Sequence, residues 1–353
     1  MDFDLTDEQR MIADTVTDVM RDADGTAVWQ SLVESGLLGM TYSEDDGGAG
    51  LGVLTLAPAL VAMGHGKDSL PIVGAAVLPG LLTSRCELPN FDASSALENA
   101  VPVAVALPEN SAGLRTENGV LNGTVQTVLG GAEAQVLLLC LESANGSACG
   151  SVELTGEGVT VTQLPLLDGQ IAADITFDNV AVSLSQASED LTGWMSDVAA
   201  VCLCAIALGA GQAMRELTRD YLTTRKQFGR PIGSFQVLQH EMVDVFHETE
   251  HFESLVLAAA SACDADDAEA RQKIVSALKR YCGTRMRDAA SACIQMHGGI
   301  GTTEEYELDR LVKRILMADM LFGTVDIHTN RLGQLIAKAA RKEAETFGLE
   351  IPA

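Results

Sequence analysis

The sequence predicts an α+β protein in which two helical regions flank a small β-domain. Apolar residues recur at helical spacing as far as about residue 100, and at every second position from about 101 to 190. The helical spacing then returns and continues to the end of the chain. We therefore expect an N-terminal helical domain (1–100), a β-domain (101–190) and a C-terminal helical bundle (191–353).

The N-terminal domain carries two helix patterns. Thr6 followed by Gln9 is a capping-box pattern, and the apolar residues within 12–20 then fall on one face. The turn-rich stretch 43–50 interrupts this pattern. A second apolar helix is expected from Val53 to Met63.

The β-domain is expected to contain several short strands. Residues 158–162 and 171–182 alternate between apolar and polar side chains, with turn residues between the segments. Residues 135–141 form an apolar run that is typical of a buried strand.

The C-terminal region again predicts helices. Val198 to Leu208 is apolar on all sides, which is typical of a helix in the middle of a bundle. Arg271 to Met296 predicts a second long helix, and Leu311 to Leu321 belongs to a third.

Charge and hydropathy exclude some classes of protein. The formal net charge of −26 argues against nucleic acid as a partner. Only five of the 23 basic residues precede residue 200, so an anionic ligand would meet the C-terminal half. No apolar run is long enough to predict a membrane span, and the acidic start Met1-Asp2-Phe3-Asp4 does not resemble a signal peptide.

The eight cysteines contain no Cys-x-x-Cys pair, and several lie in apolar runs such as Val201 to Cys204. We expect them to be small buried residues of a protein in the reducing cytoplasm. Neither a disulfide frame nor a metal site is predicted.

Two motifs stand out in the C-terminal region. Arg225 to Ile232 (Arg-Lys-Gln-Phe-Gly-Arg-Pro-Ile) is a basic turn with an aromatic residue between two long helical patterns. Gln295 to Gly301 (Gln-Met-His-Gly-Gly-Ile-Gly) is a glycine-rich kink inside another helical pattern. By themselves, the motifs favour a solvated arginine and a packing kink over contact with a cofactor.

In this order, and together with Gly36-Leu37-Leu38-Gly39, Leu121-Asn122-Gly123 and Ile175 to Val180, these motifs resemble the acyl-CoA dehydrogenase family across nearly the whole chain. The resemblance implies a helical N-terminal domain, a middle β-barrel or sandwich and a C-terminal four-helix bundle. It also implies FAD as the cofactor and α,β-desaturation of an acyl-CoA thioester as the reaction. In that reaction a carboxylate removes the α-proton and the β-hydrogen leaves as a hydride. Electron-transfer flavoprotein is the usual electron acceptor of the family.

The resemblance further implies which residues contact FAD. A guanidinium suits the diphosphate of FAD, and glycines let backbone N–H groups approach it. In the family, the two motifs contact an FAD whose flavin ring lies in the neighbouring subunit. His297 stays ambiguous between a contact residue and a structural one. By position, the FAD-binding residues are Arg225, Gln227, Phe228, Gln295, Gly298, Gly299, Gly301 and Thr324.

The chain departs from the family pattern where the catalytic base is expected. Phe322 stands in place of the usual glutamate, and Ala199 and Ala200 occupy the alternative position on an earlier helix. Thr127 and Leu129 replace the aromatic and hydroxyl residues that contact the flavin ring in the family. The base and the pocket for the flavin ring are therefore altered together.

We interpret the chain as the subunit without a catalytic base in a heteromeric FAD-dependent acyl-CoA dehydrogenase. It resembles one chain of the two-plus-two heterotetramers of bacterial steroid side-chain breakdown, whose other chain is a homologous catalytic subunit. One alternative is a self-sufficient homotetramer that uses another acid, although Asp197, Asp319 and Asp326 each read as exposed helix or cap residues. A second alternative is a non-enzymatic acyl-CoA-binding or scaffold protein, which would not need Arg225 or the Gly298-Gly299 pair.

Overall fold

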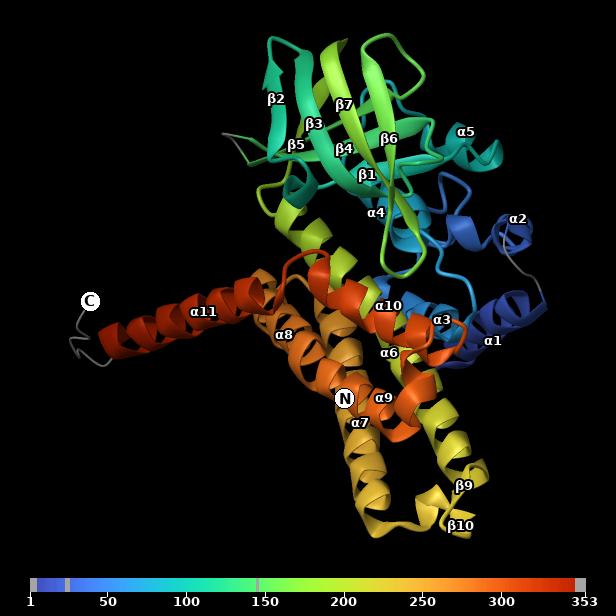
Figure 1. Cartoon of the computed structure of the whole chain (residues 1–353). Coiled ribbons are helices and arrows are strands. Elements are labelled where there is room, and N and C mark those ends of the chain that lie inside the picture. The colour runs from blue at the N-terminus through green and yellow to red at the C-terminus, as the bar shows by residue number, and fades with distance from the viewer. Residues whose placement is uncertain (1–4, 23–25, 144–145, 347–353) are drawn as a thin grey trace.

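The computed structural model describes residues 5–22, 26–143 and 146–346, so the acidic first four residues lie outside the described part. A β-domain sits above a body of helices, and the last helix projects from that body (Figure 1). Helices occupy the chain up to Glu98, two four-stranded sheets lie between Val103 and Ala187, and long helices follow from Leu191. This order confirms the α+β architecture. From these changes of secondary structure, we propose domain boundaries near residues 100 and 190.

The N-terminal helices are fixed by side-chain caps. The Thr6 N–H donates to Gln9 Oε1 (2.9 Å) and the Gln9 N–H donates to Thr6 Oγ1 (3.2 Å), so the predicted capping box forms. The carboxylate of Asp264, far along the chain, accepts the N–H groups of Val53 (2.8 Å) and Leu54 (2.9 Å) at the start of a helix. This contact ties the N-terminal domain to the C-terminal bundle. The elements are α1 (Asp7–Asp22), α2 (Thr26–Glu34), η1 (Leu37–Gly39), α3 (Val53–His65), η2 (Val73–Val77), α4 (Leu78–Thr83) and α5 (Ala93–Glu98).

The β-domain is a sandwich of two sheets with strand orders β1-β4-β5-β8 and β2-β3-β7-β6. Leu137 and Leu139 of the first sheet share a buried apolar cluster with Ile175 and Phe177 of the second. The strand predicted over 158–162 is confirmed as β6, an edge strand that pairs only with β7 and is largely exposed. The strands are β1 (Val103–Ala106), β2 (Gly113–Glu117), β3 (Val120–Leu129), β4 (Val136–Ser143), β5 (Gly146–Glu153), β6 (Val159–Pro165), β7 (Ile171–Ala181) and β8 (Leu184–Ala187), and the short helix η3 (Pro108–Asn110) precedes β2.

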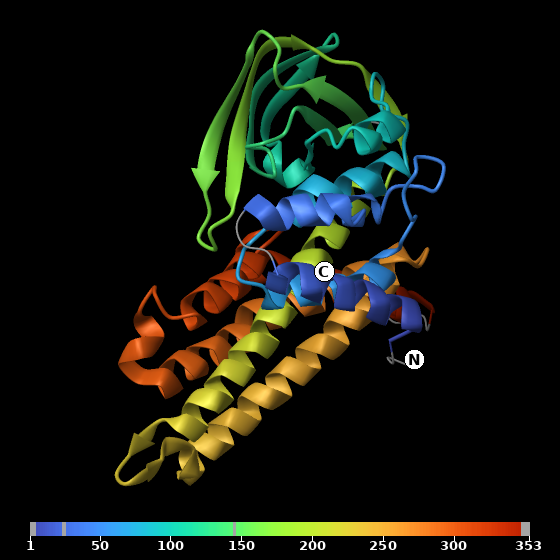
Figure 2. The same ribbon diagram turned by 90° about the vertical axis from the view of Figure 1, so that its right-hand side faces the viewer.

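The C-terminal bundle is built around α6 (Leu191–Thr224), which packs side by side with α7 (Gln236–Cys263) and extends with it beyond the body (Figure 2). Within the described ranges, α6 is the one helix long and apolar enough to cross a membrane, but 83% of that apolar stretch is buried inside the protein. Burial of this kind is typical of a core helix. The other elements are β9 (Lys226–Gln227), β10 (Arg230–Pro231), η4 (Ile232–Ser234), α8 (Ala268–Tyr281), η5 (Cys282–Met286), α9 (Arg287–His297), η6 (Gly298–Thr302), α10 (Leu308–Met320) and α11 (Val325–Thr346).

The predicted helix over Arg271 to Met296 is one helical path with a five-residue π segment, η5, between α8 and α9. All eight cysteines are free, seven of them are buried and Cys86 is half-buried, as their apolar settings predict. Within the described residues, no group of three or more His, Cys, Asp or Glu side chains could hold a metal ion.

Candidate functional site

The first motif forms a two-stranded hairpin at the far end of α6 and α7 (Figure 1). β9 pairs with β10, and Phe228 (φ 54°) and Gly229 (φ 79°) form the turn between them. A hairpin turn of type I′ needs positive φ at both central positions, and a bulky residue such as phenylalanine rarely takes this conformation. The Phe228 side chain is 90% exposed. The hairpin therefore holds a large apolar ring in solvent at a backbone position that disfavours it.

The second motif ends a helix, so the expected kink inside a helix is wrong. α9 stops at Gly298, whose φ of 63° and ψ of −142° suit glycine alone among the amino acids. A Cβ atom at Gly298 or Gly299 would meet nothing within 4 Å, so both glycines border open space. A Cβ at Gly301 would lie 2.8 Å from the Ile294 carbonyl oxygen, so this glycine permits close packing against α9.

Aromatic stacking brings the two motifs together. The Tyr221 ring, one helical turn before Arg225, lies 4.5 Å from the His297 ring between centroids, and Tyr306 lies 5.2 Å from His297 on another side. His297 is 3% exposed, and its Nδ1 lies 2.8 Å from the Cys293 carbonyl oxygen. Burial lowers the pKa of His297, so the ring is a neutral spacer. Sequence reasoning missed both tyrosines, because no local pattern indicates contacts between distant segments.

Arg225, which follows the helix that carries Tyr221, is exposed. The Arg225 guanidinium is in solvent and makes no ion pair with any residue that the structure describes. Gln227 and Gln295 are exposed as well. Arg230 is less available, because its guanidinium lies 4.1 Å from the centre of the Phe235 ring. A guanidinium without an ion pair and glycines that border open space are both suited to a phosphate or diphosphate group.

Thr324 lies apart from the other predicted FAD-binding residues. It precedes α11, whereas Gly301 precedes α10, and the 13 residues of α10 lie between them. At 1.5 Å per residue this helix is about 20 Å long. Within one chain, Thr324 therefore does not join the surface made by Arg225 and the glycines.

Phe322, where the family carries its base, is locked in place. Its φ is 53°, its side chain packs against the apolar core, and its carbonyl oxygen accepts the Nε2 proton of His328 (2.9 Å). Lys279 is fully buried and donates to the carbonyl oxygens of Ala318, Asp319 (3.2 Å) and Leu321 (2.6 Å). These contacts satisfy the end of α10 and fix the segment that carries Phe322.

The carboxylates nearest to the expected base positions are engaged elsewhere. Asp197 is 1% exposed and pairs with Arg271 (2.9 Å) and Arg331 (2.6 Å), so the expectation of an exposed residue is wrong. It lies on the core helix α6, where a carboxylate requires charged partners. Asp319 accepts the Val325 N–H (3.2 Å) as a cap of α11, and Asp326 is exposed in the first turn of that helix.

The residues at the alternative base position are also apolar and buried. Those on the strand expected to face the flavin ring are buried or held by hydrogen bonds. Ala199 and Ala200 are buried in the core. Thr127 has a φ of 52° in a bulge of β3, where its N–H donates to Asp174 (2.8 Å) and its carbonyl oxygen accepts from Asn110 (3.2 Å). Leu129 is 4% exposed and packs into the helical core.

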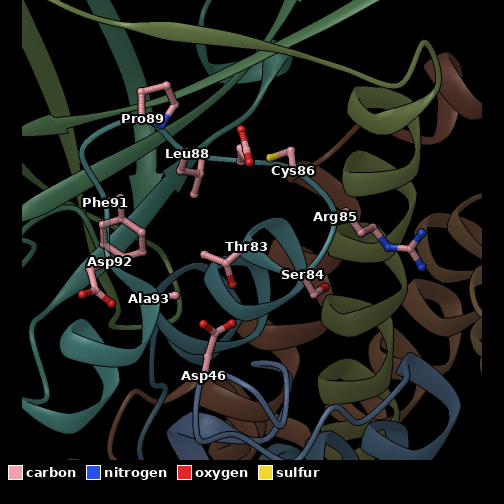
Figure 3. A pocket seen from close by; sticks show the side chains of 11 residues that line it. Asp46, Thr83, Ser84, Arg85, Cys86, Leu88, Pro89, Phe91, Asp92 and Ala93 are labelled. Carbon is pink, nitrogen blue, oxygen red and sulfur yellow. The ribbon is translucent and has the colours of Figure 1, made fainter.

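A surface groove of about 820 Å³ lies away from both motifs, between α4 and the loop that leads to α5 (Figure 3). Arg85 lies at one end with its guanidinium 3.7 Å from the Trp194 ring centre, while Asp46 and Asp92 are among the lining residues. None of the predicted site residues lines this groove. We therefore place the candidate site at the hairpin and the glycine turn.

Comparison with known proteins shows similarity over the C-terminal bundle and over the whole fold. The family model described as acyl-CoA dehydrogenase, C-terminal domain, matches residues 192–337, which include both motifs. Acyl-CoA dehydrogenase FadE28 of Mycobacterium tuberculosis is 29% identical over 338 residues, covering 92% of this chain and 95% of that protein. Among solved structures, the ChsE4-ChsE5 complex from Mycobacterium tuberculosis has a TM-score of 0.85 at 23% identity and covers 100% of both chains. A Tcur3481-Tcur3483 steroid ACAD structure has a TM-score of 0.84 at 23% identity, covering 95% of this chain and 99% of that one. The ordered motifs, the fold and these matches together make this chain similar to the acyl-CoA dehydrogenase family, with residues 192–337 matching the C-terminal domain of that family.

Proposed function

We propose that the chain is a subunit of a heteromeric FAD-dependent acyl-CoA dehydrogenase, that it contacts the FAD of a partner subunit, and that it supplies no catalytic base. One observation carries the proposal. Arg225 is exposed without an ion pair among the described residues, and Gly298 and Gly299 are exposed, whereas every position expected to carry the base or to face the flavin ring is apolar, buried or engaged. The chain therefore has residues suited to the diphosphate and adenosine part of FAD, but none suited to hold the flavin ring or to act as the base.

FAD belongs to the chemistry of this family, in which it accepts the hydride that leaves the β-carbon of the acyl group. In this chain Arg225 would bind the diphosphate, and the open surface at Gly298 and Gly299 would allow the cofactor to approach the backbone. The exposed ring of Phe228 and the exposed side-chain amides of Gln227 and Gln295 would contact the adenosine part of FAD. The partner's own residues would have to hold the flavin ring and the base.

The expected partner is a homologous chain that carries the base, with an acyl-CoA as the substrate of the complex. Support comes from the ChsE4-ChsE5 complex, which is named for two components and contains a chain of this fold. A steroid acyl group is the substrate class that the Tcur3481-Tcur3483 similarity favours. We also propose a cytoplasmic location, which fits the eight free cysteines, and electron-transfer flavoprotein as the acceptor.

Flavin content tests this proposal. The chain purified alone should be colourless or bind FAD weakly, and should not oxidise acyl-CoA in a dye-linked assay. Co-expression with a homologue that retains the glutamate should give a yellow complex with fewer flavins than subunits. A yellow homotetramer that turns over rapidly by itself would refute the half-site proposal.

A further inference from the structure

Three of the six histidines of the chain lie on one exposed face of α7. His240, His247 and His251 are exposed, and their spacings of seven and four residues place them along one line of the helix. None of the three makes a hydrogen bond or an ion pair with a residue that the structure describes. A neutral imidazole without such a partner keeps a nitrogen lone pair that can bind a metal ion.

His247 and His251 are the two that lie close enough to share a ligand. Because they are four residues apart, their side chains are neighbours on the helix surface, and their ring centroids are 6.5 Å apart with an angle of 29° between the ring planes. Two imidazoles that share one metal ion, at about 2.0–2.1 Å per bond, lie roughly 5 Å apart between centroids. Exposed side chains change rotamer freely, so a small rotation of the two rings closes this difference.

The charge around this pair favours a cation. α7 carries five acidic residues and neither lysine nor arginine over its 28 residues. Asp244, one turn before His247 on the same face, is exposed and makes no ion pair within the described ranges. Arg215 of α6 lies 4.9 Å from the centre of the Phe246 ring, but its positive charge is offset because it pairs with Glu250 (2.6 Å).

We infer that His247 and His251 form a surface site for one divalent transition-metal ion of the Ni²⁺, Cu²⁺ and Zn²⁺ class. Imidazole nitrogens suit these ions, and two histidines four residues apart on one helix face bind zinc in metalloproteases. No third His, Cys, Asp or Glu among the described residues completes a larger group, so water fills the remaining coordination positions. Neither histidine belongs to the two FAD-binding motifs, so this site does not depend on flavin binding.

Metal titration of the full-length chain, purified alone and without a polyhistidine tag, tests the inference. Isothermal titration calorimetry with Ni²⁺ gives the stoichiometry and the dissociation constant of the wild type, of His247→Ala, of His251→Ala and of the double variant. The control His240→Ala removes an exposed histidine from the same face of α7, where no second histidine lies four residues away. Alanine favours the helix at each of these exposed positions, and circular dichroism checks that the variants fold.

Electron paramagnetic resonance of the Cu²⁺ complex provides a second measurement, because nitrogen hyperfine coupling reports how many imidazoles bind the ion. The wild type should show two such nitrogens, and the double variant should lose both.

The wild type should bind one Ni²⁺ ion per chain. Loss of either imidazole should weaken binding at least about tenfold, because loss of an outer-shell partner of a ligand alone costs about ten- to a hundredfold. The His240→Ala control should bind Ni²⁺ as the wild type does. The inference would be overturned by a wild type without saturable binding up to about 1 mM Ni²⁺, by equal affinities of the wild type and the double variant, by a Cu²⁺ spectrum that the double variant leaves unchanged, or by a control as weak as His247→Ala.

Discussion

The buried ammonium of Lys279 gives the most direct test of how the Phe322 segment is held. Lys279 lies on α8, is fully buried, and is the donor for three carbonyl oxygens at the end of α10. Lys279→Met keeps most of the side-chain volume and removes all three donors. The change leaves the carbonyl oxygens of Ala318, Asp319 and Leu321 without their present partner.

The magnitude follows from the number of donors and the local exposure. An unsatisfied buried carbonyl costs about 1–3 kcal/mol, so three would cost several kcal/mol in total. Asp319 and Leu321 are half-buried, so water can replace part of the loss, and the variant no longer buries a charge. We therefore expect a loss of about 3 kcal/mol in the free energy of unfolding, a factor of about a hundred in the folding equilibrium.

Urea unfolding followed by circular dichroism measures the loss. The control is Lys273→Met on the same helix, where the lysine pairs with Glu269 at the surface (2.7 Å) and its side chain is 36% exposed. Surface pairs of this kind contribute about 0.5 kcal/mol or less. If Lys279→Met and Lys273→Met unfold at the same urea concentration, the assigned role of Lys279 is wrong.

Three further predictions concern the cofactor, the base and pH. In the complex with the base-bearing partner, Arg225→Ala should weaken FAD retention about ten- to a hundredfold through loss of a charge-assisted contact. Arg219→Ala, six residues earlier and paired with Asp220, should leave retention unchanged, and equal affinities in a flavin-release assay would contradict the assignment. Phe322→Glu, paired with a partner whose own base is removed, should restore little enoyl-CoA formation, because Leu129 is buried and Thr127 is engaged. Substantial recovered turnover would instead indicate an intact flavin site in this chain. Burial lowers the pKa of His328 to about 4. The unfolded chain therefore binds its proton first as the pH falls, and up to about 3 kcal/mol of stability is lost between pH 6.5 and 4. His328→Gln should reduce this part of the decline in urea unfolding at several pH values, and an unchanged pH dependence would exclude His328 as its source.

The order of the domains, the resemblance to the family and the residues to examine all follow from local sequence patterns. A change from a 3.6-residue to a two-residue apolar period marks the β-domain, because each period follows from the geometry of one kind of backbone. The capping box of Thr6 and Gln9 was also predictable, because both its hydrogen bonds lie within a segment of four residues. The motif that begins at Arg225, and the presence of Phe322 where the family has a glutamate, could also be identified from the sequence.

The contacts that these residues make depend on how the distant helices pack. Asp197 looked like an exposed helical residue, but two arginines from α8 and α11 reach it in the core. The stacking of Tyr221 on His297 joins two motifs that are about seventy residues apart, and Lys279 and His328 fix the segment around Phe322 from other helices. A local pattern cannot encode such contacts, because they depend on which helix faces come together when the whole chain packs.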